Sequence, residues 1–260
     1  MNKPLLKYYD FGVGLKAFSS TRKGGCSIGS YGEFNVNKYC GDEDAHIKKN
    51  KEALCVELGI EDACLVMPHQ NHGIEIKQIT PEFFDSTAVV RQQILENVDG
   101  VMTDMSGVCV AVSTADCIPI LLYDEEHHAC AAVHAGWRGT VSRIIQNAAA
   151  DMQTAYGTQM ELLKACIGPG ISLEAFEVGD EVWQVFYDAG FDMDTISRRY
   201  DKWHIDLWEC NRRQLTEVGV NPQNIQIAGI CTYSHADEYF SARRLTVNSG
   251  RILTGILFEK

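Results

Sequence analysis

The sequence is poor in proline and in basic residues, and it has no long apolar run. Only 6 of its 260 residues are proline, and no uninterrupted apolar segment is long enough to span a membrane. Its 23 basic residues against 35 acidic ones give a net charge of −12, which disfavours non-specific binding to nucleic acid or to an anionic membrane. We therefore expect neither partner, although a local basic pocket can still bind a small anion.

The cysteines lack the spacing of a disulfide or zinc-ribbon framework. Ten are present, but no two form a Cys-x-x-Cys pair, and most fall singly within apolar segments. The opening segment MNKPLLKYYDFGVG also lacks the apolar core of a secretory signal. Both observations favour a reducing location, and we expect the cytoplasm. An isolated cysteine there is a thiol, a metal ligand or a nucleophile.

Two common enzyme signatures do not fit the glycine-rich segments. TRKGGCSIGS at 21–30 lacks the Gly-Lys-Ser/Thr ending of a P-loop and does not match the dinucleotide-binding pattern. GPGIS at 168–172 has no serine between its glycines, so it is not the nucleophile turn of an α/β-hydrolase. A nucleotide cofactor and a serine hydrolase are therefore disfavoured.

The apolar pattern predicts one domain over 1–260 with a mixed α/β (α+β) fold. No linker or repeat is present, and the central strands are nearly continuous in apolarity, as buried strands are. We expect several layers, with mixed β-sheets flanked by helices. The expected strands are 13–20, 63–67, 74–79, 100–104, 108–114, 118–123, 129–135, 162–168, 225–230 and 252–258. The expected helices are 44–58, 140–156, 180–189 and one from an N-cap at Asp206 to Val218.

Three separate segments carry candidate metal ligands: MPHQNHG at 67–73, TADCIP at 114–119 and VHAGWRG at 133–139. They contain His72, Cys117 and His134, and each residue lies where a predicted strand ends or turns. Two imidazoles and a thiolate suit zinc, and three protein ligands leave a fourth position for water or substrate, as in catalytic sites. Spacing alone leaves open the alternative of a buried cysteine and two ordinary hydrogen-bonded histidines.

The segment VHAGWRGT also predicts an anion site beside the metal. A strand brings His134, a helix is expected just beyond Gly139, and its amides together with Arg138 would hold a phosphate or a carboxylate. The alternative is that Trp137 and Arg138 pack at a surface corner. The same ambiguity applies to the cluster Arg243, Arg244 and Arg251, which is more typical of a solvated basic face. Candidate substrate or phosphate contacts are Arg22, Asn35, Gln70, Arg138 and Arg243.

Taken together, these segments resemble the multicopper polyphenol oxidase, or laccase-domain, family, also described as a purine nucleoside phosphorylase and peptidoglycan-editing factor family. The similar segments are FSSTRKGG…FNVN, HQNHG, DGVMTD, STADCIPILLYD, AAVHAGWRGT, CIGPGIS, FEVGDEV and SGR, which span most of the chain. One departure is LTVNSGR after FSARR, where the family usually has an Asp-Gly turn leading to TGR.

The resemblance implies a metal-dependent enzyme that acts on small molecules. It carries the family's metal triad onto His72, Cys117 and His134, and leaves His69 outside it. The implied activity is phosphorolysis of adenosine, inosine, guanosine and methylthioadenosine, so the expected partners are a purine nucleoside and phosphate. Adenosine deamination is implied as a second activity. For the deamination we expect Asp116 to transfer protons, with Cys117 and His134 in the catalytic centre.

Three alternatives remain at this point. Copper in place of zinc would give laccase-like phenol oxidation, but the eight histidines contain no His-x-His pair of the kind that multicopper clusters need. Cys117 with His134 as its base would make a cysteine hydrolase, such as one that processes muropeptides, and that chemistry has no need of His72. A structural zinc would need a fourth protein ligand, such as His69 or Asp116. The sequence leaves the oligomeric state open.

Overall fold

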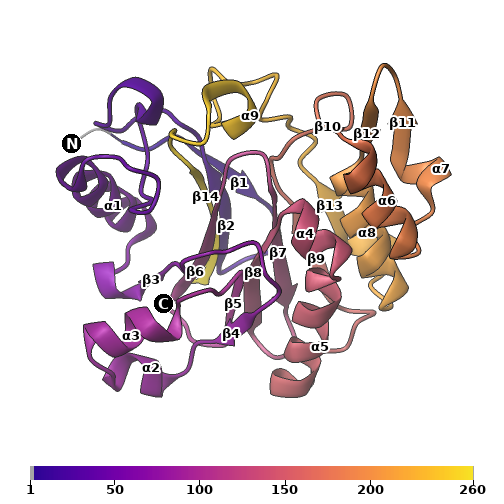
Figure 1. Cartoon of the computed structure of the whole chain (residues 1–260). Coiled ribbons are helices and arrows are strands. Elements are labelled where there is room, and N and C mark those ends of the chain that lie inside the picture. The colour runs from indigo at the N-terminus through magenta and orange to yellow at the C-terminus, as the bar shows by residue number, and fades with distance from the viewer. Residues whose placement is uncertain (1–2, 260) are drawn as a thin grey trace.

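Two mixed β-sheets pack face to face, and helices cover their outer faces (Figure 1). The computed structural model describes residues 3–259. The first sheet has the order β1 (Leu6–Tyr9), β2 (Leu15–Ser20), β14 (Ile252–Phe258), β6 (Cys109–Thr114) and β3 (Leu65–Val66). The second has the order β13 (Ile225–Ile227), β9 (Lys164–Ile167), β7 (Ile118–Asp124), β8 (Ala129–Ala135), β5 (Gly100–Thr103) and β4 (Ile76–Gln78).

The remaining elements lie around this pair of sheets. A small third sheet has the order β10 (Glu177–Val178), β12 (Trp203–Ile205) and β11 (Ser197–Arg199). The helices are α1 (Asp44–Leu58), α2 (Pro81–Asp85), α3 (Ala88–Ile94), α4 (Trp137–Val141), α5 (Ile144–Tyr156), α6 (Asp180–Asp188), α7 (Met193–Ile196), α8 (Leu207–Glu217) and α9 (Ala242–Leu245). Three short 3₁₀ turns are Gly29–Tyr31, Asp62–Cys64 and Pro222–Asn224. This arrangement confirms the predicted single domain with mixed sheets flanked by helices.

The central strands bury both of their faces, which explains their continuous apolarity. In β6, Val110 faces the core between the sheets, where it joins Leu121 of β7. Its neighbour Ala111 points the other way, into a core shared with Leu54 of α1. The outer face of the second sheet packs against α5 and α8 in the same manner. Because successive side chains of a strand alternate between faces, such strands need apolar residues at every position.

Two helices begin or end at the capping residues that the sequence predicts. Helix α1 ends at Gly59, whose φ of 74° is the left-handed conformation that glycine adopts without strain. Helix α8 begins after Asp206, whose side chain accepts a hydrogen bond from the amide of Glu209. The helices predicted at 44–58 and after Asp206 are thereby confirmed.

The predicted helix over 140–156 is wrong as a single element. It is two helices, α4 and α5, separated at Arg143, whose φ is +63°. The Arg143 guanidinium lies 4.0 Å from the ring centroid of Phe191 and donates a hydrogen bond to the carbonyl of Ala189. These tertiary contacts hold the break, and the apolar pattern, which continues across it, did not reveal them. The predicted strand at 225–230 is likewise only Ile225–Ile227.

The sheets bring several strand ends to one end of the molecule. Strand β6 ends at Thr114, the chain crosses to the second sheet through 115–117, and β7 begins at Ile118. The antiparallel β8 ends beside the start of β7, where Ile118 pairs with Ala135. Polar and titratable side chains can therefore gather here, outside the apolar cores.

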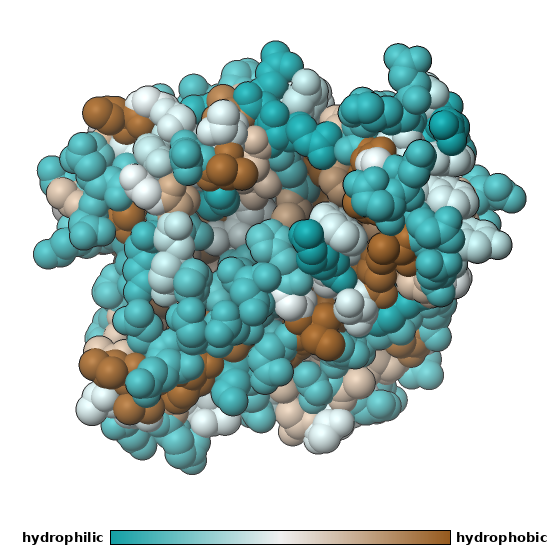
Figure 2. Space-filling view, viewed as in Figure 1, coloured by the Kyte–Doolittle hydropathy of each residue, from teal (hydrophilic) through white to brown (hydrophobic). Residues whose placement is uncertain are grey.

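Within residues 3–259, no helix combines the length and apolarity needed to cross a bilayer. Figure 2 shows hydrophilic residues covering most of the face drawn there, with hydrophobic residues in separate patches.

Candidate metal site and its cavity

The three predicted metal ligands meet at this end of the sheets. The ligand atoms of His72, Cys117 and His134 all lie within 4.8 Å of one another. The imidazole rings of the two histidines are 4.9 Å apart and cross at 75°. His72 is exposed, Cys117 half-buried and His134 buried, so the group reaches from the core to the solvent. No other group of His, Cys, Asp or Glu within residues 3–259 meets the same criterion.

Asp99, which the sequence analysis did not single out, organises this group. Its side chain is fully buried and accepts a 2.7 Å hydrogen bond from Nδ1 of His134, which leaves Nε2 of His134 free to bind a metal. It also accepts hydrogen bonds from the backbone amides of Asn71, His72 and Gly73. Its position before β5, in the segment DGVMTD, was the only sequence signal for this role.

The same hydrogen bonds control the charge of Asp99. Burial alone would raise its pKa, but the hydrogen bond and the charge of His134, together with the amide of Gly73, lower it. Asp99 is therefore an anion inside the protein, and it fixes both an imidazole and the turn that carries His72.

Cys117 is poised as a thiolate. Burial opposes ionisation, but the charge of His134 and hydrogen bonds from His134 and His72 lower the pKa of Cys117 to about 6. The reciprocal effect raises the pKa of His134 to about 9, against the opposing influence of burial. Without a metal, the two residues form a thiolate–imidazolium pair.

Gly136 leaves the space that this group occupies. A Cβ atom added there would lie 3.0 Å from Cδ2 of His72 and 3.2 Å from Sγ of Cys117. The backbone of the turn after β8 can therefore approach the three ligands only because position 136 has no side chain.

The residues fit a borderline-soft divalent ion. One thiolate and two imidazoles are the donors preferred by zinc and also by copper, and the Asp99–His134 hydrogen bond is the second-layer support typical of such sites. An ion held by these three residues, which also line a cavity, would have a coordination position left for a substrate.

The cavity has a volume of about 840 Å³, within the range of small-molecule sites. Its apolar wall includes Trp137, Ile171 and Phe176, and its cations include Arg243 and Arg251. A polar side is formed by Asn37, Gln70, Ser113 and Thr114. Nδ2 of Asn37 donates to the Ser113 hydroxyl, and Gln70 exchanges hydrogen bonds with the backbone of Ser113, which locks the end of β6.

Three of the predicted site residues besides the metal ligands line this cavity: Asp116, Gln70 and Arg243. Asp116 has a φ of +84°, and each carboxylate oxygen already accepts a hydrogen bond. The donors are the hydroxyl of Thr232 and the backbone amide of Arg243, both at 2.7 Å. Asp116 thus joins two loops at the cavity wall. Arg251 also lines the cavity, whereas its sequence cluster is more typical of a solvated basic face.

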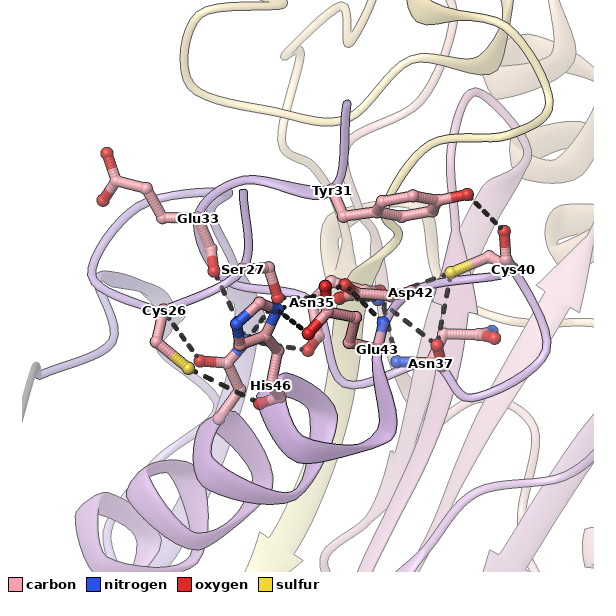
Figure 3. A network of polar contacts seen from close by, with 11 residues as sticks. Cys26, Ser27, Tyr31, Glu33, Asn35, Asn37, Cys40, Asp42, Glu43 and His46 are labelled. Atoms are coloured by element: carbon pink, nitrogen blue, oxygen red, sulfur yellow. Dashed lines mark hydrogen bonds and ion pairs between the residues drawn. The ribbon is translucent and has the colours of Figure 1, made fainter. Parts of the chain in front are cut away.

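Arg22 and Asn35 lie away from the cavity and hold a loop. The guanidinium of Arg22 donates to the carbonyls of Gly32 and Ala236. Asn35 is fully buried and donates to Asp42 in the polar network of Figure 3. Neither residue is among those that line the cavity, and their role as substrate contacts stays a prediction.

Arg138 also lies outside the cavity lining. Its side chain is exposed, and its guanidinium lies 4.3 Å from the ring centroid of Trp137. Helix α4 begins at Trp137, earlier than predicted, so Arg138 is a helical residue on the outer surface. The alternative in which Trp137 and Arg138 pack at a corner describes this contact better, although Trp137 also lines the cavity.

One motif match was missed in the sequence. Residues 25–29, GCSIG, have the Gly-x-Ser-x-Gly spacing of a hydrolase nucleophile. Ser27 is buried, donates a 2.7 Å hydrogen bond to Asp42 and accepts one from Asn50 (Figure 3). The segment lies in a loop without a preceding strand or a following α-helix, so Ser27 belongs to the loop network and is not a nucleophile.

Comparison with known proteins shows a consistent set of relatives. The family model described as multi-copper polyphenol oxidoreductase laccase matches residues 16–259. A purine nucleoside phosphorylase from Bacteroides thetaiotaomicron is 46% identical over 249 residues, which cover 95% of this chain and 92% of the relative. Adenosine deaminase RL5, from an unknown prokaryotic organism, is 37% identical, with 94% of each chain covered. The crystal structure of the hypothetical protein YfiH from Bacillus licheniformis aligns with a TM-score of 0.90 and 25% identity, covering 99% of this chain and 97% of that one.

The role of Asp99 can be tested by Asp99→Asn. An amide accepts the hydrogen bond from Nδ1 of His134 less strongly and holds the neutral, metal-binding ring less firmly, so we expect about 10–100-fold weaker zinc binding. Competition with a chromogenic chelator measures the change. The matched control is Asp124→Asn. Asp124 is also a buried carboxylate that bonds a histidine, His127, but this pair lies outside the metal site. Equal zinc affinity in wild type and Asp99→Asn would contradict the assignment.

The lowered pKa of Cys117 predicts selective alkylation of the metal-free protein. A thiol with a pKa of about 6 is mostly thiolate at pH 7 and is protonated below pH 6. Iodoacetamide should therefore modify Cys117 at pH 7 before Cys55 and Cys130, whose pKa values are raised by burial. Peptide mass spectrometry gives the rates. A Cys117 rate that rises steeply between pH 7 and 9, as for an ordinary thiol, would disprove the pairing with His134.

Proposed function

Since the chain belongs to the multi-copper polyphenol oxidoreductase laccase family, we propose that it is a zinc-dependent purine nucleoside phosphorylase. The observation that carries the proposal is that the three-ligand group and two arginines line one cavity of nucleoside-sized dimensions. The proposed substrates are adenosine, inosine, guanosine and methylthioadenosine, with inorganic phosphate as the second substrate. A cytoplasmic location is part of the same proposal.

The cavity offers separate surfaces to the parts of these substrates. The apolar wall that includes Trp137 and Phe176 suits the flat, largely apolar purine. We assign the ribose hydroxyls to the polar side of the cavity, which Asn37, Gln70, Ser113 and Thr114 form. Arg243 and Arg251 are the arginines that line the cavity among the described residues, and we assign the phosphate to them. Each guanidinium also donates to backbone carbonyls nearby, which holds it in position.

Three sets of hydrogen bonds around the triad hold the groups that face a substrate. Asp99 fixes His134, the Gln70–Ser113 hydrogen bonds fix the end of β6, and Asp116 joins the loops at Thr232 and Arg243. When bound at the triad, zinc supplies Lewis acidity, which polarises a substrate atom and makes water more acidic.

Adenosine deamination is a second candidate activity at the same site. The relative named adenosine deaminase supports it, and replacement of the amino group by water is a reaction that a zinc centre with an open position can assist. Asp116 stays the predicted proton-transfer residue for this reaction. Phosphate dependence separates the two reactions, because deamination consumes water only.

We do not assign multicopper oxidase chemistry to the described chain. The single cluster of candidate ligands within residues 3–259 cannot supply the several copper centres that this chemistry needs. Copper bound at the same triad remains an alternative to zinc, and metal analysis of the protein as purified decides between the two ions.

The direct test is turnover of a nucleoside panel by purified protein, with and without phosphate. We expect release of free purine and ribose 1-phosphate that requires phosphate, and loss of both metal and turnover in Cys117→Ala. Chromatography of the products and metal analysis provide the measurements. Muropeptides serve as the competing substrate panel. Unchanged turnover in Cys117→Ala, or purine release that is independent of phosphate, would refute the phosphorylase proposal.

The phosphate assignment predicts a selective effect of Arg243→Gln. Removing a charge-assisted contact costs about 1.5–3 kcal/mol, so the KM for phosphate should rise about tenfold or more while the KM for nucleoside changes little. The matched control is Arg244→Gln, since Arg244 is the next residue of α9, lies over the ring of Tyr233 and is outside the cavity lining. Equal phosphate KM values in both variants would remove Arg243 from this role.

A further inference from the structure

A histidine outside the metal triad also lines the cavity. The side chain of His69 contributes to the cavity wall, and its Nδ1 lies 2.7 Å from Oε1 of Glu96, which is not among the lining residues. The Nδ1 edge of the ring therefore faces away from the cavity. In the part of the chain that the structure describes, Nε2 of His69 has no hydrogen-bond partner.

Contacts on several sides hold this ring in place. Tyr39 stacks on it with ring centroids 3.7 Å apart and planes 14° apart. The backbone amide of His69 donates to the carbonyl of Leu95, and a parallel β-bridge joins His69 to Glu96. Tyr39 also lines the cavity, and Nζ of Lys38 lies 4.9 Å from its ring centroid. The ring is thus fixed, with 37% of its side-chain surface exposed.

A histidine held in this way is arranged to exchange a proton through one nitrogen. A carboxylate on Nδ1 sets the tautomer and the orientation of an imidazole, and leaves Nε2 to meet a ligand. The metal ligands cannot do this while they bind an ion. Asp116 is less suited, because both of its oxygens already accept hydrogen bonds.

We propose that His69 is the general acid that protonates the leaving purine at N7, and that Glu96 is its positioning residue. This inference rests on the proposed phosphorolysis. Protonation at N7 matters because the purine otherwise leaves as an anion, and general acid catalysis of this kind contributes about 10²–10⁴ in rate.

The step balances without a further reactant. A phosphate oxygen forms the bond to ribose C1′ as the bond from C1′ to N9 breaks, and that electron pair passes into the purine ring. His69 reacts as the imidazolium: its Nε2 proton moves to N7, so the base leaves neutral, while its Nδ1 proton stays in the hydrogen bond to Glu96. Hydrogen phosphate loses its proton on forming ribose 1-phosphate, and this proton returns to His69 through solvent. No group is oxidised or reduced.

The test compares each nucleoside that the wild type cleaves with its N7-methyl derivative. The methyl derivative already carries the positive charge that protonation would create, so it needs no acid. In His69→Gln we expect kcat/KM for the unmethylated nucleoside to fall about 10²-fold or more, and that for the methylated one to change less than about threefold. Glu96→Gln should show a smaller loss of the same selective kind.

The matched control is His127→Gln. His127 also bonds a carboxylate through Nδ1, that of Asp124 at 2.9 Å, but it is outside the cavity lining. Both rates should be unchanged in this variant, and the zinc content of all variants should equal that of the wild type.

The outcomes separate this inference from the proposed function. A wild type that cleaves no nucleoside in phosphate refutes the phosphorylase and the inference with it. Three outcomes would overturn the role of His69 alone. The wild type could cleave unmethylated nucleosides but reject the methylated ones. The His69→Gln variant could lose both rates equally, or keep its full rate on unmethylated nucleosides.

Discussion

The buried hydrogen bond between Asp99 and His134 is the interaction on which the site depends. An unpaired buried carboxylate would be strongly destabilising, and here the imidazole and three backbone amides offset that cost. The same contacts join the turn at 71–73, the start of β5 and the end of β8. The Asp99 side chain therefore sets the distance between His72 and His134, which are far apart in the sequence. It also turns the Nε2 edge of His134 toward Cys117, the third ligand.

The two-sheet architecture explains why the chemistry lies where it does. Central strands that bury both faces have no room for polar side chains along their length. Polar groups concentrate where the strands leave the cores, at Ser113 and Thr114 at the end of β6, Cys117 before β7 and His134 near the end of β8. The loop network around Asn35 and Asp42 lies beside the start of α1 (Figure 3) and fixes the loop from which Asn37, Tyr39 and Cys40 line the cavity.

The sequence was informative where the residue type restricts the chemistry. Two histidines and a cysteine at strand ends indicated a three-ligand group, and capping residues such as Asp206 indicated helix ends. The sequence did not indicate which distant residues contact each other in the fold. Asp99 is one aspartate before a strand, and Asn35 is polar whether it faces a ligand or the network that buries it. The break at Arg143 depends on Phe191, which no local pattern connects to it.

The origin of the three ligands in separate segments has a thermodynamic consequence. An ion that binds only when these segments are assembled stabilises the folded state by an amount that grows with the logarithm of its free concentration, about 2.7 kcal/mol at one hundred times its dissociation constant. That amount is a substantial part of the stability of an ordinary domain. The fraction of chains that stay folded, and so escape proteolysis, would then follow the supply of metal to the compartment in which the protein resides.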